Sequence, residues 1–278
     1  MSNSLNPDNK MIVTVAVNGS VPTKEQTPHV PVTPAEVIED TVRCWEAGAS
    51  IVHIHARDEN QRPCHDFEFF AECLEGIRAR CDIIVQFSTG SRGAVDRETR
   101  IEAVSLKPDM MSLNAGCCNF VQGPHVNSLK DIEYWLKEMK EHGVKPEIEC
   151  FDLSHVYTGR EFYRQGLIEP PAFFNIILGV PGALPYSPQN FMSMFSSLPE
   201  EAMFNSIGVG RFQLPVTVMA TALGGHVRVG LEDNIYYSYR VLGTNREFVE
   251  RAVRIAQECQ REVAGPREAR ELLGISAP

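Results

Sequence analysis

Two kinds of segment alternate along the chain, and they differ in the spacing of their hydrophobic positions. Short apolar runs rich in β-branched residues, bounded by glycine, proline or asparagine, are typical of buried strands. Longer segments in which apolar residues recur every three or four positions are typical of helices with one buried face. The strand-like runs lie at 11–17, 50–57, 82–87, 110–114, 146–151, 173–178, 202–207 and 226–230. The helix-like segments lie at 33–47, 66–81, 129–142, 156–166, 188–198, 215–223 and 246–262, and one more begins near 96.

This alternation gives eight strand-plus-helix units, with no linker-like change of composition between them. Such units predict a parallel sheet, and eight of them close most simply into an α/β fold, the (β/α)8 TIM barrel. We therefore expect residues 1–278 to form a single TIM-barrel domain, with a short helix near 267–273 as a C-terminal helical tail. A doubly wound open sheet is the alternative, although no GxGxxG sequence lies between a strand and a helix to support dinucleotide binding.

Composition and charge exclude several classes of partner. Hydrophobic residues make up 43% of the chain, which allows a sizeable core, but no apolar run is long enough to predict a membrane span. The net charge of −10 and the absence of a basic run argue against nucleic acid and against an anionic membrane surface. Residues 1–10 are polar and show no signal-peptide pattern. The eight cysteines have no repeated CxxC spacing, so we expect reduced thiols in a cytoplasmic protein.

Two histidines in the second strand-like run are the first candidates for chemistry. Successive strand residues point to opposite faces, so His53 and His55 project side by side, with Arg57 on the same face. Two imidazoles in this arrangement can hold one divalent metal, typically zinc. The alternative is a pair of core histidines with ordinary hydrogen bonds, but the second histidine in register favours a metal site.

Further polar residues follow the ends of the predicted strands, where the active sites of TIM barrels lie. They are Ser88, Ser112, Asn114, Glu147, Glu149, Arg228, Glu232 and Asp233. The eighth strand of a barrel closes beside the first, so Glu232 can reach the same mouth as the histidine pair and supply a third ligand. Alternatively, Glu232 and Asp233 are acids at the first turn of a helix, where they favour the helix dipole.

The sequence resembles the β-keto acid cleavage enzymes, formerly a domain of unknown function and typified by 3-keto-5-aminohexanoate cleavage enzyme. The resemblance covers nearly the whole chain and depends on seven short motifs in order. They are TKEQ at 23–26, HIHAR at 53–57, QFSTG at 86–90, SLNAG at 112–116, PEIE at 146–149, LGVPG at 178–182 and GLEDN at 230–234. The resemblance implies an acyltransferase in which a β-keto acid reacts with the co-substrate acetyl-CoA to give acetoacetate and a new acyl-CoA.

The resemblance also implies a role for each candidate. His53, His55 and Glu232 would be the Zn2+ ligands, and Asp233 the general base, with Arg228 and Glu149 beside it. Ser88, Ser112, Asn114 and the backbone at Gly90 would bind the substrate carboxylate. Two histidines and one glutamate leave a coordination position open, as catalytic zinc requires. Zinc there would act as a Lewis acid on the keto oxygen and make the neighbouring C–H easier to deprotonate.

One residue departs from the pattern of the typifying enzyme. That enzyme carries a glutamate after its first strand for the substrate ammonium, and Val21 takes this place here. Valine cannot offset the several kcal/mol that a buried ammonium costs. We therefore expect a β-keto acid with a neutral or apolar tail, although a quaternary ammonium such as dehydrocarnitine could still be received by aromatic residues.

Two other functions fit the same fold. One is a different metal-dependent carbon–carbon lyase, an aldolase that acts on a 2-keto acid without CoA. The other is a non-catalytic barrel that binds a ligand or serves in an assembly. For the enzyme we also expect a homo-oligomer, a dimer or a tetramer.

Overall fold

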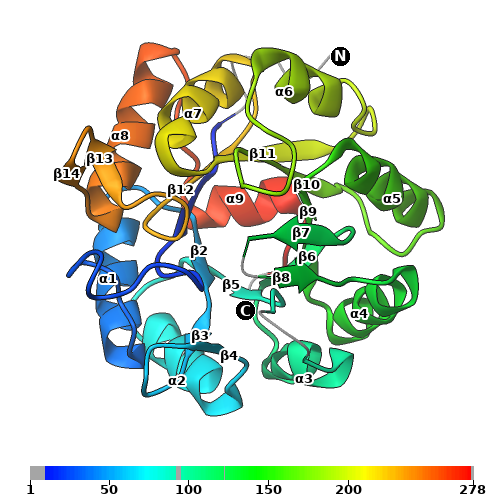
Figure 1. Cartoon of the computed structure of the whole chain (residues 1–278), viewed down its shortest axis with the longest axis horizontal. Helices are drawn as coiled ribbons and strands as arrows, with labels where there is room; N and C mark the ends of the chain where they lie inside the picture. Colours follow the sequence, from blue (N-terminus) through cyan, green and yellow to red (C-terminus); the bar gives the residue numbers. More distant parts are fainter. Residues whose placement is uncertain (1–9, 92–94, 122, 277–278) are drawn as a thin grey trace.

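The computed structural model describes residues 10–91, 95–121 and 123–276. Residues 1–9 and 92–94, which include most of the polar N-terminus and part of the turn expected after the third strand, lie outside the described residues. Eight parallel strands form one sheet in the order β11–β10–β9–β6–β5–β2–β1–β12, with helices around it (Figure 1). The strands are β1 (Val13–Ala16), β2 (Ile51–Ile54), β5 (Ile84–Ser88), β6 (Met110–Asn114), β9 (Lys145–Cys150), β10 (Phe173–Leu178), β11 (Met203–Gly208) and β12 (Val227–Val229).

The first and last strands of this order lie next to each other and nearly close the barrel. Just before β12, the His226 N–H donates to the carbonyl of Phe204 in β11, with 2.8 Å between nitrogen and oxygen. β1 stands between β2 and β12, as in a barrel whose last strand returns to the first. The TIM-barrel prediction is confirmed, and the doubly wound alternative is wrong.

Helices cover the outside of the barrel, and side-chain caps mark where most of them begin. Thr33 and Thr244 each cap a helix in a capping box with the glutamate three residues later. The apolar faces of the helices pack on the outward side chains of the strands, which places the main core between the two layers. The α-helices are α1 (Pro34–Glu46), α2 (Phe67–Arg78), α3 (Arg97–Ile101), α4 (Leu129–His142), α5 (Leu153–Arg164), α6 (Pro188–Phe195), α7 (Gln213–Ala222), α8 (Asn245–Glu258) and α9 (Pro266–Leu273).

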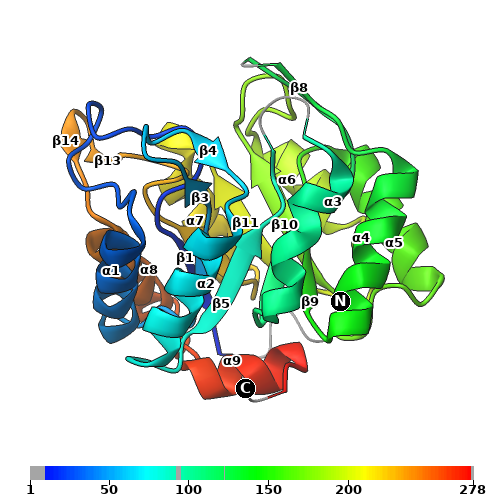
Figure 2. The same cartoon turned by 90° about the horizontal axis from the view of Figure 1, so that it is seen from below.

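The inside of the barrel is apolar at its amino-terminal end and polar above it. Ile12, Ile51, Ile84, Met110 and Phe173 form a second core with α9, which lies across this end of the barrel (Figure 2). The next inward position of each strand is polar or charged, and all eight of these residues are buried. They are Thr14, His53, Gln86, Ser112, Glu147, Asn175, Asn205 and Arg228. The open, carboxyl end of the strands therefore has a polar floor.

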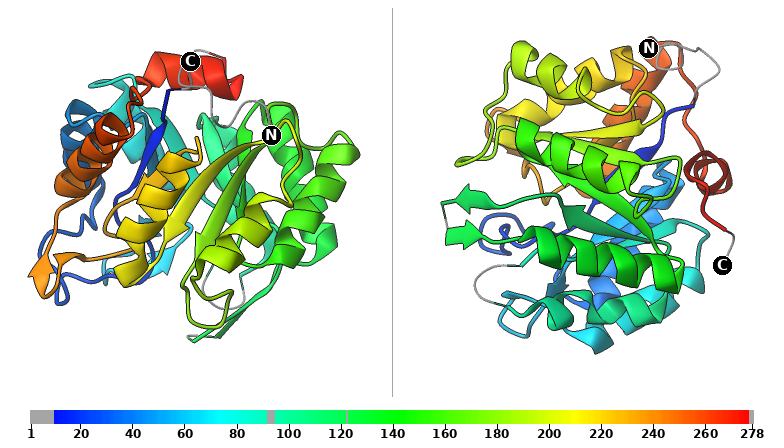
Figure 3. Two further views of the ribbon diagram at one scale, coloured as in Figure 1. Left: turned by 90° about the horizontal axis from the view of Figure 1, so that it is seen from above. Right: turned by 90° about the vertical axis from the view of Figure 1, so that its right-hand side faces the viewer.

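Three two-stranded hairpins that the sequence did not predict extend the loops after β2, β6 and β12. They are β3 (Ala56–Arg57) with β4 (Pro63–Cys64), β7 (Cys118–Phe120) with β8 (Gly123–His125), and β13 (Tyr236–Ser238) with β14 (Val241–Leu242). Figure 3 shows α9 (red) and the β13–β14 hairpin (orange) at opposite ends of the barrel. The hairpins thus surround the mouth.

The strand predicted at 50–57 is too long. β2 ends at Ile54, and the two residues of β3 pair with β4 instead of continuing in the barrel sheet. The side chain of Asn18 bonds both the N–H and the carbonyl of His55, at 3.0 and 2.8 Å. These two bonds satisfy the backbone where it leaves the sheet. His55 still lies beside His53, but Arg57 does not join them and instead bonds the backbone of residues 18–22.

We expect Leu273→Ala to destabilise the protein, because Leu273 is fully buried where α9 meets the barrel. Loss of a buried leucine costs roughly 2–5 kcal/mol, which urea unfolding followed by circular dichroism would measure. Leu129→Ala is the control, since Leu129 is 63% exposed and should change stability by at most about 0.5 kcal/mol. Equal small effects would mean that α9 adds little to stability.

Candidate active site

A cavity of about 400 Å³ opens at the carboxyl ends of the strands and contains most of the predicted site residues. Its polar lining residues include His55, Ser88, Gly90, Asn114, Glu149, Arg228, Glu232 and Asp233. Its apolar lining residues include Val21, Phe120, Phe151, Ile177, Ile207 and Tyr236. A cavity of this size and mixed lining suits a small organic acid.

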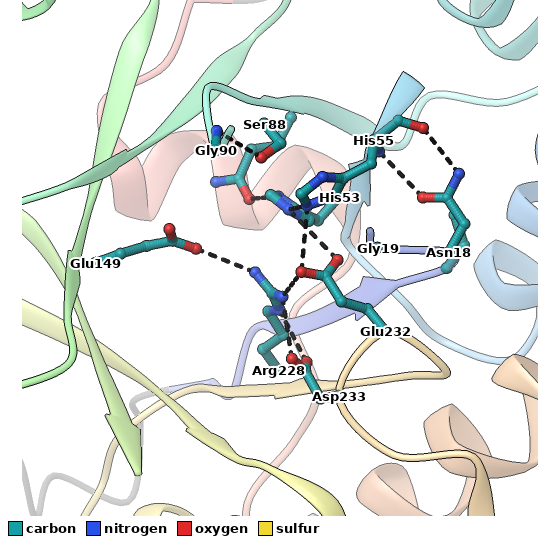
Figure 4. A network of polar contacts seen from close by, with 12 residues as sticks. Asn18, Gly19, His53, His55, Ser88, Gly90, Glu149, Arg228, Glu232 and Asp233 are labelled. Carbon is teal, nitrogen blue, oxygen red and sulfur yellow. Dashed lines mark hydrogen bonds and ion pairs between the residues drawn. The ribbon is translucent and has the colours of Figure 1, made fainter. Parts of the chain in front are cut away.

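Three potential metal ligands converge at this mouth. The Nε2 atoms of His53 and His55 lie 3.0 Å apart, and carboxylate oxygens of Glu232 lie 3.5 and 3.2 Å from them (Figure 4). Two ligands of a tetrahedral zinc ion, each at its usual bond length, stand about 3.3 Å apart. Oε2 of Glu232 is buried and has no hydrogen-bond partner among the described residues. The three side chains therefore fit a divalent metal.

The protonation of these side chains suits metal binding. Nδ1 of His53 lies 2.7 Å from Oε1 of Gln86, an acceptor, so the ring proton belongs on Nδ1 and Nε2 keeps its lone pair. Burial, with the nearby Arg228 charge, lowers the pKa of His53 well below its usual range. Burial alone would raise the pKa of Glu232, but Arg228 and the two histidines hold it well below normal. A neutral imidazole and an ionised carboxylate are the forms that bind metal.

Arg228 connects Glu232, one of the three potential ligands, to two further acids. Its Nε and Nη2 atoms bond both oxygens of Asp233 at 3.0 and 3.1 Å, and Nη1 lies 3.2 Å from Glu149. Its Nη2 also lies 2.6 Å from Glu232. Burial raises the pKa of Asp233 to about 7, although Arg228 opposes the shift. Burial likewise raises the pKa of Glu149 to about 8, again against Arg228. A carboxylate with a raised pKa beside a metal site is suited to proton transfer.

The residues predicted to bind the substrate carboxylate are only partly brought together. Ser88, Gly90 and Asn114 line the cavity, and Oγ of Ser88 accepts from the Gly90 N–H at 3.0 Å. Ser112 is fully buried and is not part of the lining. It belongs to the polar floor, where its Oγ has no hydrogen-bond partner among the described residues. Val21 also lines the cavity and is 46% exposed.

Sequence reasoning missed several residues that complete the site. Gln86, which orients His53, has the same strand parity as Ser88, and that parity could have identified it. Phe120 and His125 belong to the β7–β8 hairpin, and their rings stack with centroids 6.0 Å apart. Nothing in the hydrophobic periodicity marks this hairpin, so its part in the cavity wall was not foreseen.

Comparison with known proteins decides the family. The sequence profile of the beta-keto acid cleavage enzymes matches residues 10–275. The chain belongs to this family. The resemblance inferred from the seven motifs is therefore confirmed.

Individual relatives in the family cover nearly the whole chain. A 3-keto-5-aminohexanoate cleavage enzyme of Acetoanaerobium sticklandii is 41% identical over 96% of this chain and 99% of its own length. A 3-oxoadipate:acetyl-CoA acetyltransferase of Cupriavidus necator is 36% identical, over 95% and 94%. A 3-dehydrocarnitine:acetyl-CoA trimethylamine transferase of Rhizobium meliloti is 30% identical, over 98% and 99%.

Solved structures support the fold. The apo structure of ObcA superposes with a TM-score of 0.76 at 20% identity, covering 89% of this chain and 66% of that chain.

No helix among the described residues is long and apolar enough to cross a membrane. The cytoplasmic location, the homo-oligomer and the single-domain organisation stay predictions from the sequence.

We expect His53→Ala or His55→Ala to abolish metal binding, because each removes a ligand of a three-residue site. The measurement is metal content by atomic absorption after equilibration with zinc and desalting. His29→Ala is the matched control, since His29 is exposed and far in sequence from the cluster, and it should keep the metal. Full occupancy in the double variant would contradict this assignment.

Proposed function

We propose that this enzyme uses zinc to condense a 3-keto acid with acetyl-CoA, giving acetoacetate and a new acyl-CoA. The observation that carries the proposal is the convergence of His53, His55 and Glu232 beside the Arg228–Asp233 pair. When bound, zinc would supply a Lewis acid for the keto oxygen of the substrate. Relatives named as acetyl-CoA transferases support the co-substrate.

Asp233 is the residue best placed to move the proton. It would take a proton from C2 of the keto acid, after which C2 attacks the acetyl carbonyl and the CoA thiolate leaves. The thiolate then adds to the C3 ketone, the C2–C3 bond breaks, and the proton returns from Asp233 to C2. Atoms balance, because the acetyl group moves to C2 and the acyl group moves to CoA. Arg228 holds the Asp233 carboxylate through two bonds and so fixes the direction of transfer.

Ser88, Asn114 and Gly90 form the proposed carboxylate subsite, with Ser112 beneath them. Because Oγ of Ser88 accepts from the Gly90 N–H, its own hydrogen is free to donate to the substrate. Ser112 would act indirectly, through the polar floor.

The charges around the cavity support a neutral substrate tail. Among the described residues that line it, the acids are Glu149, Glu232 and Asp233, and all three contact Arg228. No other lining carboxylate is left to pair with a substrate ammonium. Arg228 is the lining arginine, and its donors are shared among these acids, so a second substrate carboxylate would lack a partner too. Val21 then faces an apolar or neutral tail.

The proposal is tested by incubating the purified enzyme with zinc, a panel of 3-keto acids and acetyl-CoA. We expect acetoacetate release that requires acetyl-CoA, with a neutral 3-keto acid as the preferred substrate. Cleavage that proceeds without CoA would instead identify an aldolase-type lyase. Absence of turnover on every acid of the panel would favour the non-catalytic barrel.

Replacing Asp233 should distinguish loss of the general base from loss of metal binding. We expect Asp233→Asn to retain zinc and fold while kcat falls by roughly two orders of magnitude or more, the usual loss for a general base. Steady-state kinetics and metal content measure the two effects. If kcat survives and only KM rises, Asp233 binds substrate and Glu149 becomes the candidate base.

Replacing Val21 should change substrate choice. Val21→Glu would place an anion against a neutral tail and create a partner for an ammonium. Relative preference should shift toward a 5-amino substrate by about fivefold, because Val21 is 46% exposed and an ion pair at such a site contributes up to about 1 kcal/mol. The measurement compares kcat/KM of a neutral 3-keto acid with that of its 5-amino analogue.

Val218→Glu is the matched control for this substitution, with similar exposure (44% against 46%) but a position on α7 outside the cavity lining. It should leave the ratio unchanged. An unchanged ratio in Val21→Glu would mean that another residue sets the tail preference.

A further inference from the structure

Arg57 is a buried cation that bonds backbone carbonyls on two loops. Its Nε donates to the Gly19 carbonyl at 2.6 Å, and Nη2 donates to the carbonyls of Asn18 and Pro22, each at 3.0 Å. Nη1 donates to the carbonyl of Gln61 at 2.7 Å. The residue is 4% exposed. Arg57 therefore fastens the segment 18–22, which follows β1, to the hairpin that follows β2.

Backbone carbonyls take the place of an acidic partner around Arg57. Among the described residues, no carboxylate oxygen lies within ion-pair distance of its guanidinium. Buried arginines are normally paired with a carboxylate, because an uncompensated charge in the interior is costly. Burial lowers the pKa of Arg57, and the charge of Glu232 is the largest influence against that shift. These hydrogen bonds of the guanidinium therefore all hold backbone in place, close to the potential metal ligand Glu232.

The segment that Arg57 holds contacts two of the three metal ligands. The side chain of Asn18 bonds the His55 backbone on both sides, as Figure 4 shows. Gly19 has φ +59°, and a Cβ there would lie 2.3 Å from Cγ of Glu232. A side chain at position 19 would therefore displace Glu232 or the segment itself. The position of this backbone limits where both ligands can lie.

The same segment forms part of the substrate cavity. Ser20, Val21 and Pro22 line it directly after Gly19. Because the bonds from Arg57 lie on both sides of Ser20 and Val21, at the carbonyls of Gly19 and Pro22, they fix the ends of this piece of wall. One guanidinium thus controls the ligand side of the cavity and the wall next to it.

We propose that Arg57 is a positioning residue that places His55, Glu232 and the cavity wall through the segment 18–22. Its part in the metal site and the cavity rests on the proposed function. Lysine cannot replace it fully, because a single ammonium cannot reach four carbonyls that surround a planar fork.

The test is the zinc affinity of the apoprotein, measured by competition with a chromophoric chelator, for wild type and Arg57→Met. Methionine keeps the apolar stem and removes all donors. We expect zinc affinity to fall about 10–100-fold, the usual effect of losing an outer-shell partner. KM for the 3-keto acid should also rise about tenfold, since the wall at 20–22 is released. Arg57→Lys should lie between wild type and Arg57→Met in both measurements.

Arg261→Met is the matched control. Arg261 is also buried and donates to backbone carbonyls, those of Thr221, Gly224 and Gly225, next to the start of β12 and away from the mouth. It should lose stability to urea without a change in zinc affinity. If Arg57→Met loses stability as Arg261→Met does but binds zinc within twofold of wild type, the positioning role is overturned.

Two further measurements, on Gly19→Ala and on the wild-type protein, cover the case in which Arg57→Met does not fold and the case in which no zinc binds. If Arg57→Met does not fold, Gly19→Ala is measured in the same assay with Arg57 intact. It should weaken zinc binding at least tenfold because its Cβ meets Glu232, and wild-type affinity there would overturn the proposal. A wild-type protein that binds no zinc would overturn the proposed function, and the role of Arg57 toward the metal with it.

Discussion

The site depends on the Arg228 guanidinium, which forms ion pairs with three carboxylates in one buried region. It lies 2.6–3.2 Å from oxygens of Glu232, Asp233 and Glu149 and is itself almost inaccessible. Without it, burial and mutual repulsion would raise the pKa values of these acids further and they would take up protons, because an uncompensated buried charge costs several kcal/mol. Glu149 belongs to β9 and Arg228 to β12, which are not neighbours in the sheet. The Arg228 side chain therefore connects β9 and β12 across the candidate active site.

The loop after β12 passes close over the end of β1, and this brings Glu232 next to the histidines from β2. β2 carries His53, and the loop after β12 carries Glu232, with β1 between these strands. Gly230 has φ +136°, and a Cβ there would lie 2.3 Å from the carbonyl oxygen of Ala16, so only glycine lets the chain turn this tightly over the end of β1. Gly19, just after β1, has no side chain and so leaves room for the side chain of Glu232. The convergence of His53, His55 and Glu232 is a consequence of strand order together with these two glycines.

Much of this arrangement could be predicted, and the failures share a cause. His53 and His55 were found from strand parity, and Glu232 from the rule that the last strand of a barrel returns to the first. The direction of Arg57 was missed because the backbone leaves the sheet at His55, through a side-chain contact from a distant part of the sequence. The depth of Ser112 depends on the tilt and stagger of the strands, which local sequence does not encode. The hairpins around the mouth have too few residues to show a period.

The distribution of charge also explains how an acidic protein can accept an anionic substrate. The net charge of −10 provides no attraction at long range. The Arg228 cation inside the cavity is already paired with its acids, so in the proposed function the substrate carboxylate would depend on short-range neutral donors. Such donors contribute only about 0.5–1.5 kcal/mol each in water-exposed settings, and more where water is excluded. Ser88 and Asn114 line a cavity that also has many apolar lining residues, among them Phe120, Phe151 and Ile177. In the proposed function, exclusion of water by these apolar residues would be part of carboxylate binding, and the residues that contact the substrate tail would also strengthen the contacts to its head.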